Sequence, residues 1–235
     1  MWRYMRKKEL YKVIFLLILL GLLYYGIFVL QGKDFYLISL SIIVIGLMGF
    51  LLSFEKKRPG AALLTVVSSL CALAVASRIL FFFLPQIKPM AAVVIIAGVV
   101  FGPETGFVTG AVSAFVSNFY FGQGSWTPFQ MFALGMVGYF AGVFFRGSRN
   151  RILVMIYGFF SVVVLYGGIV EINSVYFSLG ESVTAEAVAG IYLAALPFNL
   201  LFGVSTAVFL FFLYRPILKH LERLDKKYCF IDKGE

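Results

Sequence analysis

Charge is what this sequence has least of. Only 13% of its 235 residues are Asp, Glu, Lys or Arg, whereas 61% are hydrophobic, and the mean hydropathy is +0.96. Soluble domains carry about 25% charged and about 45–50% apolar residues. An aqueous core cannot absorb such an excess, so the composition excludes soluble enzymes, DNA-binding domains and disordered modules. It indicates a polytopic helical membrane protein.

Residues that carry chemistry are scarce as well. The single histidine, His220, falls in the C-terminal tail, which excludes histidine-based catalysis or metal binding inside the membrane. Cys71 falls mid-helix and Cys229 in the tail, so no disulfide is expected. The sequence has no G-x-x-x-x-G-K-[ST] phosphate loop and no paired carboxylates within its apolar runs, as proton-driven carriers have. We therefore expect no catalytic residue, no metal site and no cofactor.

The apolar runs predict the number of membrane spans. A helix needs about 20 residues to cross the roughly 30 Å hydrocarbon layer. The long run Thr105–Phe145 must hold two crossings, because the polar segment Ser117–Gln130 interrupts it. The prediction is an all-α polytopic membrane protein with eight spans. The uncharged runs are Val13–Gly32, Phe35–Phe54, Pro59–Ser77, Pro89–Pro103, Thr105–Phe145, Ile152–Val170 and Ala187–Tyr214.

The basic residues predict the orientation. Of the 20 Lys and Arg, 17 fall on one side of the eight-span arrangement, and the other side receives only Lys33 and Lys88. The positive-inside rule then places both termini in the cytoplasm of a multi-pass cell-membrane protein. The net charge of +9 reflects topology and contact with the lipid bilayer, and predicts no nucleic-acid partner. The 17 are Arg3, Arg6, Lys7, Lys8, Lys12, Lys56, Lys57, Arg58, Arg146, Arg149, Arg151, Arg215, Lys219, Arg223, Lys226, Lys227 and Lys233.

The chain divides into three predicted parts. Residues 1–58 form a two-helix transmembrane hairpin, residues 59–215 a six-helix core, and residues 216–235 a basic amphipathic cytoplasmic tail. The tail is expected to lie along the inner membrane leaflet, with contact to a cytoplasmic partner as the alternative. Its apolar face consists of Ile217, Leu218, Leu221 and Leu224.

The segment Ser117–Met131 is the strongest candidate for ligand contact. It combines amides, hydroxyls and aromatic rings on the outer side, a set that can stack on a planar ligand and hydrogen-bond its edges. The alternative is an interfacial aromatic belt with a turn, although a belt does not need amides. The candidate residues are Asn118, Gln123, Gly124, Trp126, Thr127 and Gln130.

Other candidates come from neighbouring outer segments. Lys88 ends the connection Phe83–Pro89, and Glu171 and Asn173 begin a third outer connection. Asn199 lies about one-third of the way into the last span, and an unpaired amide in hydrocarbon is costly. Asn199 is therefore expected to face the bundle, either toward the ligand or in a helix–helix hydrogen bond.

Arg78 lies near the outer end of its helix, seven residues before Pro85. From there its side chain can snorkel to the membrane surface, and this structural role is preferred. The alternatives are an ion pair with Glu171 and contact with an acidic group of a ligand.

Three motifs resemble one family. They are Ala72–Ala76 followed by Ser77 and Arg78, the segment Ala97–Gly106 (AGVVFGPETG), and Ser117–Met131 with its run GQGSWTPFQM. Over Ala61–Tyr214 the chain is similar to the substrate-binding S components of energy-coupling factor (ECF) vitamin transporters. The resemblance implies a six-helix bundle, here preceded by the extra hairpin, with a vitamin site under the outer loops. It further implies a transmembrane coupling subunit that contacts Ala72 and Ala76, and two ATPase subunits that power release inward.

The resemblance leaves the ligand open. The Trp-Thr-Pro run looks like that of S components for cobalamin-type ligands, and an aromatic, amide-rich loop suits a large neutral molecule better than a dianion. Riboflavin or another planar vitamin fits the same description. The alternatives to an S component are a self-sufficient carrier or channel, and a membrane scaffold without a ligand.

Overall fold

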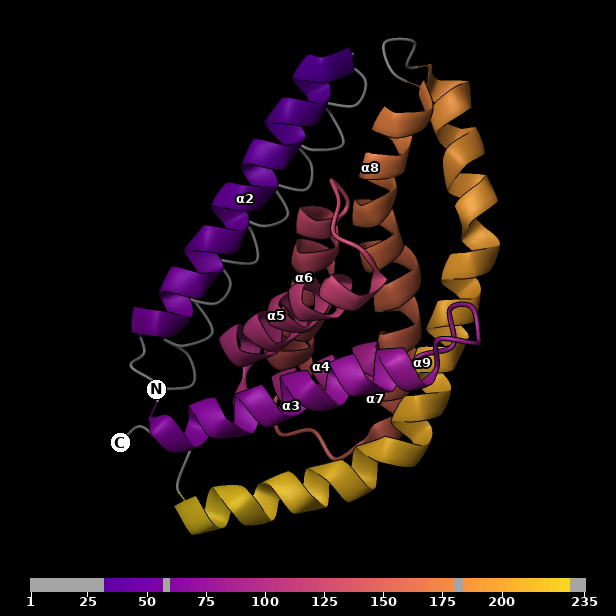
Figure 1. Ribbon diagram of the computed structural model, residues 1–235. Coiled ribbons are helices and arrows are strands. Elements are labelled where there is room, and N and C mark those ends of the chain that lie inside the picture. Colours follow the sequence, from indigo (N-terminus) through magenta and orange to yellow (C-terminus); the bar gives the residue numbers. More distant parts are fainter. Residues whose placement is uncertain (1–31, 57–59, 180–183, 229–235) are drawn as a thin grey trace.

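The computed structural model describes residues 32–56, 60–179 and 184–228 (Figure 1). Within these ranges the chain is helical and contains no β-strand. The predicted first span, Val13–Gly32, lies outside the described residues except for Gly32. Cys229 also lies outside them. The prediction of an all-α polytopic protein is confirmed for the described part, and the count of eight spans stays a prediction.

Most of the described helices are long enough to cross a membrane, and Met90–Phe101 is shorter. Three segments, α7 (Arg151–Phe160), η1 (Ser161–Tyr166) and α8 (Gly167–Leu179), follow one another without a break and make one continuous helical segment with a π-helical middle. Five segments, Leu37–Glu55, Ala61–Leu80, Thr127–Phe145, Arg151–Leu179 and Ala185–Leu221, are long and apolar enough to cross a membrane. The elements are α2 (Gly32–Lys56), α3 (Ala61–Leu80), α4 (Met90–Phe101), α5 (Pro103–Phe121), α6 (Thr127–Phe145), α7 (Arg151–Phe160), η1 (Ser161–Tyr166), α8 (Gly167–Leu179) and α9 (Ala185–Tyr228).

Helix α4 is the centre of the bundle. All 12 of its residues are buried, as expected of a helix that is apolar on every side. It packs against α3, α5, α6 and α9. It ends at Gly102, whose φ of 97° is a left-handed conformation that favours glycine, and Pro103 then begins α5. The Gly-Pro pair thus reverses the chain within two residues and sets α5 beside α4.

Glycines let α4, α5 and α6 approach until their backbones touch. A Cβ atom on Gly106 of α5 or on Gly98 of α4 would collide with the carbonyl oxygen of Gly138 on α6. A Cβ on Gly110 would collide with the carbonyl of Leu134 on α6. In lipid, such close packing replaces the hydrophobic effect as the force between helices. The small residues along α5 therefore fix the position of α5 against α6.

Helix α2 is packed into the bundle along α5, α6 and α8. The Phe50 ring stacks on the Phe107 ring with centroids 4.1 Å apart and meets the edge of Tyr139 at 5.0 Å. Ile43 and Leu47 are buried in the same cluster. The described half of the predicted hairpin therefore packs on the other helices through one face, and much of its remaining surface is exposed.

Two connections that the sequence assigns to the outer side are shorter than it indicates. The polar segment Ser117–Gln130, which the sequence indicates as the interruption between two crossings, is largely helical. Helix α5 continues to Phe121, and α6 begins at Thr127 with Pro128 in its first turn. Proline is favourable at that position because its missing N–H would have no helical partner there. Glu171 and Asn173 likewise lie inside α8, which continues to Leu179, and not in a loop.

The C-terminal part of α9 turns beneath the bundle (Figure 1). The helix contains Pro197 and Pro216. Beyond Pro216, Leu218 and Leu221 are buried in the cluster formed around α4, and the Tyr214 hydroxyl donates to the carbonyl of Ser148 at 2.6 Å. At these residues the apolar face that was expected to contact the inner leaflet packs on the protein itself.

The glycine contacts predict a sharp stability difference between two alanine variants. Gly138→Ala places a Cβ against the Gly106 carbonyl, and overpacking of this kind costs about 1–3 kcal/mol. Gly49→Ala in α2 meets nothing within 4 Å, so it should leave stability unchanged or raise it by up to about 1 kcal/mol. Thermal unfolding of the detergent-solubilised variants measures both effects, and equal melting temperatures would contradict the role given to Gly138.

Candidate functional site

Arg78, in the last turn of α3, points toward α5. Its Nη1 atom donates to Ser117 Oγ at 2.5 Å and to Asn118 Oδ1 at 2.9 Å. Its guanidinium lies 4.4 Å from the centre of the Phe121 ring. Among the described residues all its partners are neutral, so the ion pair with Glu171 is not formed. Arg78 fastens the C-terminal end of α3 to the C-terminal end of α5.

Asn118 connects this contact to α6. Its Oδ1 accepts from Arg78, and its Nδ2 donates to Thr127 Oγ1 at 3.2 Å and to Gln130 Oε1 at 2.9 Å. The residue is 1% exposed. Buried amides need hydrogen-bond partners, and these three bonds supply them for both the oxygen and the nitrogen of the Asn118 side chain. Asn118 therefore joins three helices through one side chain.

The turn between α5 and α6 is held by the same network. Thr127 Oγ1 donates to Gln123 Oε1 at 2.9 Å and accepts from the Gly124 backbone N–H at 3.2 Å. Gln123 Nε2 donates to the Phe115 carbonyl at 3.0 Å. The Trp126 ring lies against Gly124, where a Cβ would collide with it. Trp126 is 40% exposed, and Gly122 and Gln123 of the same turn are exposed as well.

Lys88 lies on the connection between α3 and α4. Its backbone N–H donates to Ser205 Oγ on α9 at 3.0 Å, and its Nζ lies 4.4 Å from the centre of the Phe202 ring. Two residues earlier, Gln86 has a φ of 59°, uncommon for a residue with a side chain. Burial, with a smaller contribution from the Arg78 charge, lowers the pKa of Lys88 to about 7. The connection thus carries the lysine inward against α9.

The remaining candidates lie on α8 and α9. Asn173 is 8% exposed, and its Oδ1 has no hydrogen-bond partner among the described residues. Glu171 and Arg78 both lie within electrostatic range of Tyr166. Asn199 faces the bundle, as expected, and lies against Gly167 of α8, where a Cβ would collide with its amide. The third outer connection falls at residues 180–183, outside the described residues.

The structure thus joins some predicted residues and separates others. Six form one hydrogen-bonded network, Lys88 lies within electrostatic range of it, and no described hydrogen bond links Glu171, Asn173 or Asn199 to it. The structure also adds Phe121, Phe202 and Ser205, which the sequence does not single out, because the inner and lipid-facing sides of an apolar helix look alike. The six joined residues are Arg78, Asn118, Gln123, Gly124, Thr127 and Gln130.

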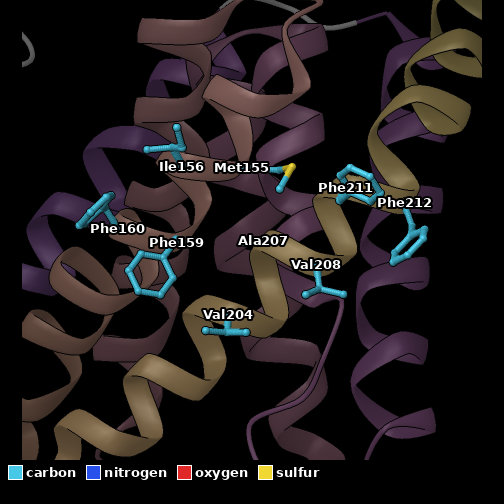
Figure 2. Close-up of a pocket in the computed structure, with 9 residues that line it drawn as sticks. All are labelled: Met155, Ile156, Phe159, Phe160, Val204, Ala207, Val208, Phe211 and Phe212. Carbon is cyan, nitrogen blue, oxygen red and sulfur yellow. The ribbon is translucent and has the colours of Figure 1, made fainter.

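An apolar groove lies elsewhere, between α7 and α9 (Figure 2). Its volume is about 360 Å³. It offers no polar side chain that could orient a vitamin, so it does not compete with the network as a ligand site. Its lining consists of Met155, Ile156, Phe159, Phe160, Val204, Ala207, Val208, Phe211 and Phe212.

Ala72 and Ala76 are exposed on α3. Helix α2 packs on α5, α6 and α8 and leaves both alanines uncovered. Their small side chains would let another helix approach the α3 backbone closely.

The fold and this network define a class: a multi-pass helical membrane protein with a polar cluster joining the ends of several spans. A family model, that of the ECF-type riboflavin transporter S component, matches residues 60–219. The chain belongs to this family of transmembrane vitamin-transport subunits, and the resemblance seen in its sequence is confirmed. Comparison with curated proteins and with solved structures gives no significant match.

The network predicts that Asn118 matters for stability. Asn118→Ala removes three hydrogen bonds and leaves Arg78 without one of its acceptors, which should lower the free energy of unfolding by about 1–3 kcal/mol. Gln123→Ala acts at the exposed end of the same network and should cost less. Unfolding in detergent compares the two, and a larger loss for Gln123→Ala would contradict the central place given to Asn118.

Proposed function

We propose that this chain is the substrate-capture subunit of an ECF-type importer. It binds a vitamin or related micronutrient from outside and releases it inward when coupled to a transmembrane subunit and two ATPases. It performs no catalysis itself. The observation that carries the proposal is the polar network that joins α3, α5 and α6, in a chain that belongs to a family of vitamin-transporter S components.

Coupling to partners supplies what the sequence lacks. The chain has no phosphate loop, so nucleotide hydrolysis must come from other subunits. The exposed Ala72 and Ala76 of α3 are the surface that we assign to the coupling subunit. The excess of Lys and Arg on one side supports an arrangement with both termini in the cytoplasm, which puts the network of Asn118 on the outer side.

The ligand that we propose is a large molecule with a planar ring system. The exposed Trp126 ring offers a stacking surface, and the adjoining network holds the ring in place. The run GQGSWTPFQM favours a cobalamin-type ligand, whereas the description of the matched family names riboflavin. Both are retained as candidates, since a stacking surface suits either.

Ligand capture is tested most directly on the purified chain. Mass spectrometry of the small molecules released from the detergent-purified protein should identify a vitamin-like compound, and a titration with that compound should saturate. Trp126→Ala should weaken its binding by about tenfold or more, because the stacking surface is lost, with little change in melting temperature, because the ring is partly exposed. Flat titrations with riboflavin, cobalamin and other vitamins would favour a scaffold without a ligand.

Partner contact is tested by adding bulk to α3. Ala72→Trp and Ala76→Trp should reduce co-purification with the coupling subunit and ATPases, because an indole prevents close approach of a helix. Ligand binding should remain. Leu193→Trp, at a position 66% exposed on α9, is the matched control and should assemble normally. Assembly and uptake that survive both alanine variants would contradict the assignment, and transport in liposomes without ATPases would favour a self-sufficient carrier.

A further inference from the structure

The apolar groove between α7 and α9 is almost as long as one membrane leaflet is deep. Its lining on α9 extends from Val204 to Phe212, which is about 12 Å at the helical rise of 1.5 Å per residue. One leaflet of the roughly 30 Å hydrocarbon layer is about 15 Å deep. On α7 the lining begins at Met155, toward the end where Phe211 and Phe212 lie (Figure 2). In length, the groove therefore matches one acyl chain of a lipid.

The two helices that form this groove are in close contact. A Cβ atom on Gly203 of α9 would collide with Val163, and a Cβ on Gly158 of α7 would collide with Leu210 of α9. Glycine at both positions lets the helices approach each other. The groove is thus preformed by the packing of α7 on α9, and a preformed site lowers the entropic cost of binding.

Two arginines lie at one end of the groove. The Arg151 guanidinium lies 4.1 Å from the centre of the Phe211 ring, and Phe211 lines the groove. Arg215 follows Phe211 by four residues, so it lies one turn farther along the same face of α9, and it is exposed. Arg151 likewise precedes Met155 by one turn. Both positive charges are therefore about 6 Å beyond the lining, where the headgroup of a lipid in the groove would lie.

The chemistry of these arginines suits a phosphate. The Phe211 ring contacts the face of the Arg151 guanidinium, so the N–H donors at the edge of the group point away from the ring. Guanidinium edges bind phosphate oxygens through parallel hydrogen bonds. No ion pair between described residues involves Arg151 or Arg215. A phosphate at this end of the groove would complement both charges.

The lining suits an acyl chain better than a helix of another protein. Helices that associate in lipid meet through small residues, as α5 and α6 do at Gly106 and Gly138. The groove instead presents phenylalanine, methionine and branched aliphatic side chains, and Ala207 is the one alanine among them. A flexible chain of methylene groups can follow such an uneven surface, whereas a helix needs close approach of its backbone.

We propose that the groove between α7 and α9 holds one acyl chain of an anionic phospholipid whose phosphate binds Arg151 and Arg215. Both arginines belong to the basic set that predicts the cytoplasmic side, and the cytoplasmic leaflet is the one that carries anionic lipids. The site does not involve the network of Asn118. It therefore goes beyond the proposed capture function and does not depend on it.

The headgroup contact is tested by lipid retention. The full chain is purified in detergent, stripped of lipid and titrated with equal amounts of phosphatidylglycerol and phosphatidylcholine, and native mass spectrometry counts the bound lipids. One phosphatidylglycerol should be retained in preference to phosphatidylcholine. Arg151→Gln should reduce this preference about fivefold, the equivalent of about 1 kcal/mol per basic residue. Arg223→Gln, an exposed position eight residues beyond Arg215, is the matched control and should leave the preference unchanged.

The acyl-chain contact is tested by filling the groove. Ala207→Phe places a ring where the chain is expected to lie, and should abolish retention of phosphatidylglycerol although both arginines remain. Leu193→Phe adds the same bulk outside the groove, at a position 66% exposed and about 21 Å earlier on α9, and should retain the lipid. A melting temperature equal to that of the unmodified chain verifies that each variant is folded. If Ala207→Phe fails to fold, the comparison of Arg151→Gln with Arg223→Gln still decides the proposal.

Three results would overturn the lipid site. The first is equal retention of both lipids, or a preference that Arg151→Gln leaves unchanged. The second is a preference that survives in folded Ala207→Phe, because the anion would then bind without the groove. The third is a chain that retains no phosphatidylglycerol and loses the coupling subunit in Ala207→Phe, which would make the groove a docking surface for a helix of that subunit. None of these results bears on vitamin binding, so the capture function is tested separately.

Discussion

The contact of bare backbones between α5 and α6 is the constraint on which the rest of this structure depends. Gly106 and Gly138 meet without any side chain between them, and the buried α4 packs against both helices. Because the helices are this close, Asn118 at the end of α5 reaches Thr127 and Gln130 at the start of α6. With ordinary side chains at the glycine positions, the helices would stand farther apart and these hydrogen bonds would not form.

The polar network follows from the same closeness. Burying Asn118 in a bundle of apolar helices is acceptable only because every polar end of its side chain has a partner. Arg78 completes the arrangement by crossing from α3. Because the network bonds three packed helices to one another, it fixes the position of the α5–α6 turn and of the exposed Trp126 ring in that turn. Rigid placement of an exposed aromatic ring lowers the entropic cost of binding a planar molecule.

The two polar regions differ in how many of their hydrogen-bonding groups have partners within the protein. In the α5–α6 turn, Asn118, Gln123 and Thr127 are hydrogen-bonded within the protein, whereas Ser125 Oγ has no partner among the described residues. This region acts mainly as a fastening. Around Lys88, the cation faces the Phe202 ring and the backbone bonds to Ser205, so hydrogen-bonding capacity remains.

The sequence by itself determined the membrane class, the helical architecture and the family, since long apolar runs and short motifs are local features of the chain. It also identified Asn118, Thr127 and Gln130 as candidates for ligand contact, because an interfacial aromatic belt does not need amides. It could not determine that Pro128 begins a helix, that α8 extends through Glu171, or that Leu218 packs on the core. Only the tertiary structure decided which polar groups pair and which stay free, because that depends on distances between residues such as Arg78, Asn118 and Lys88 that are far apart in sequence and meet only through helix packing.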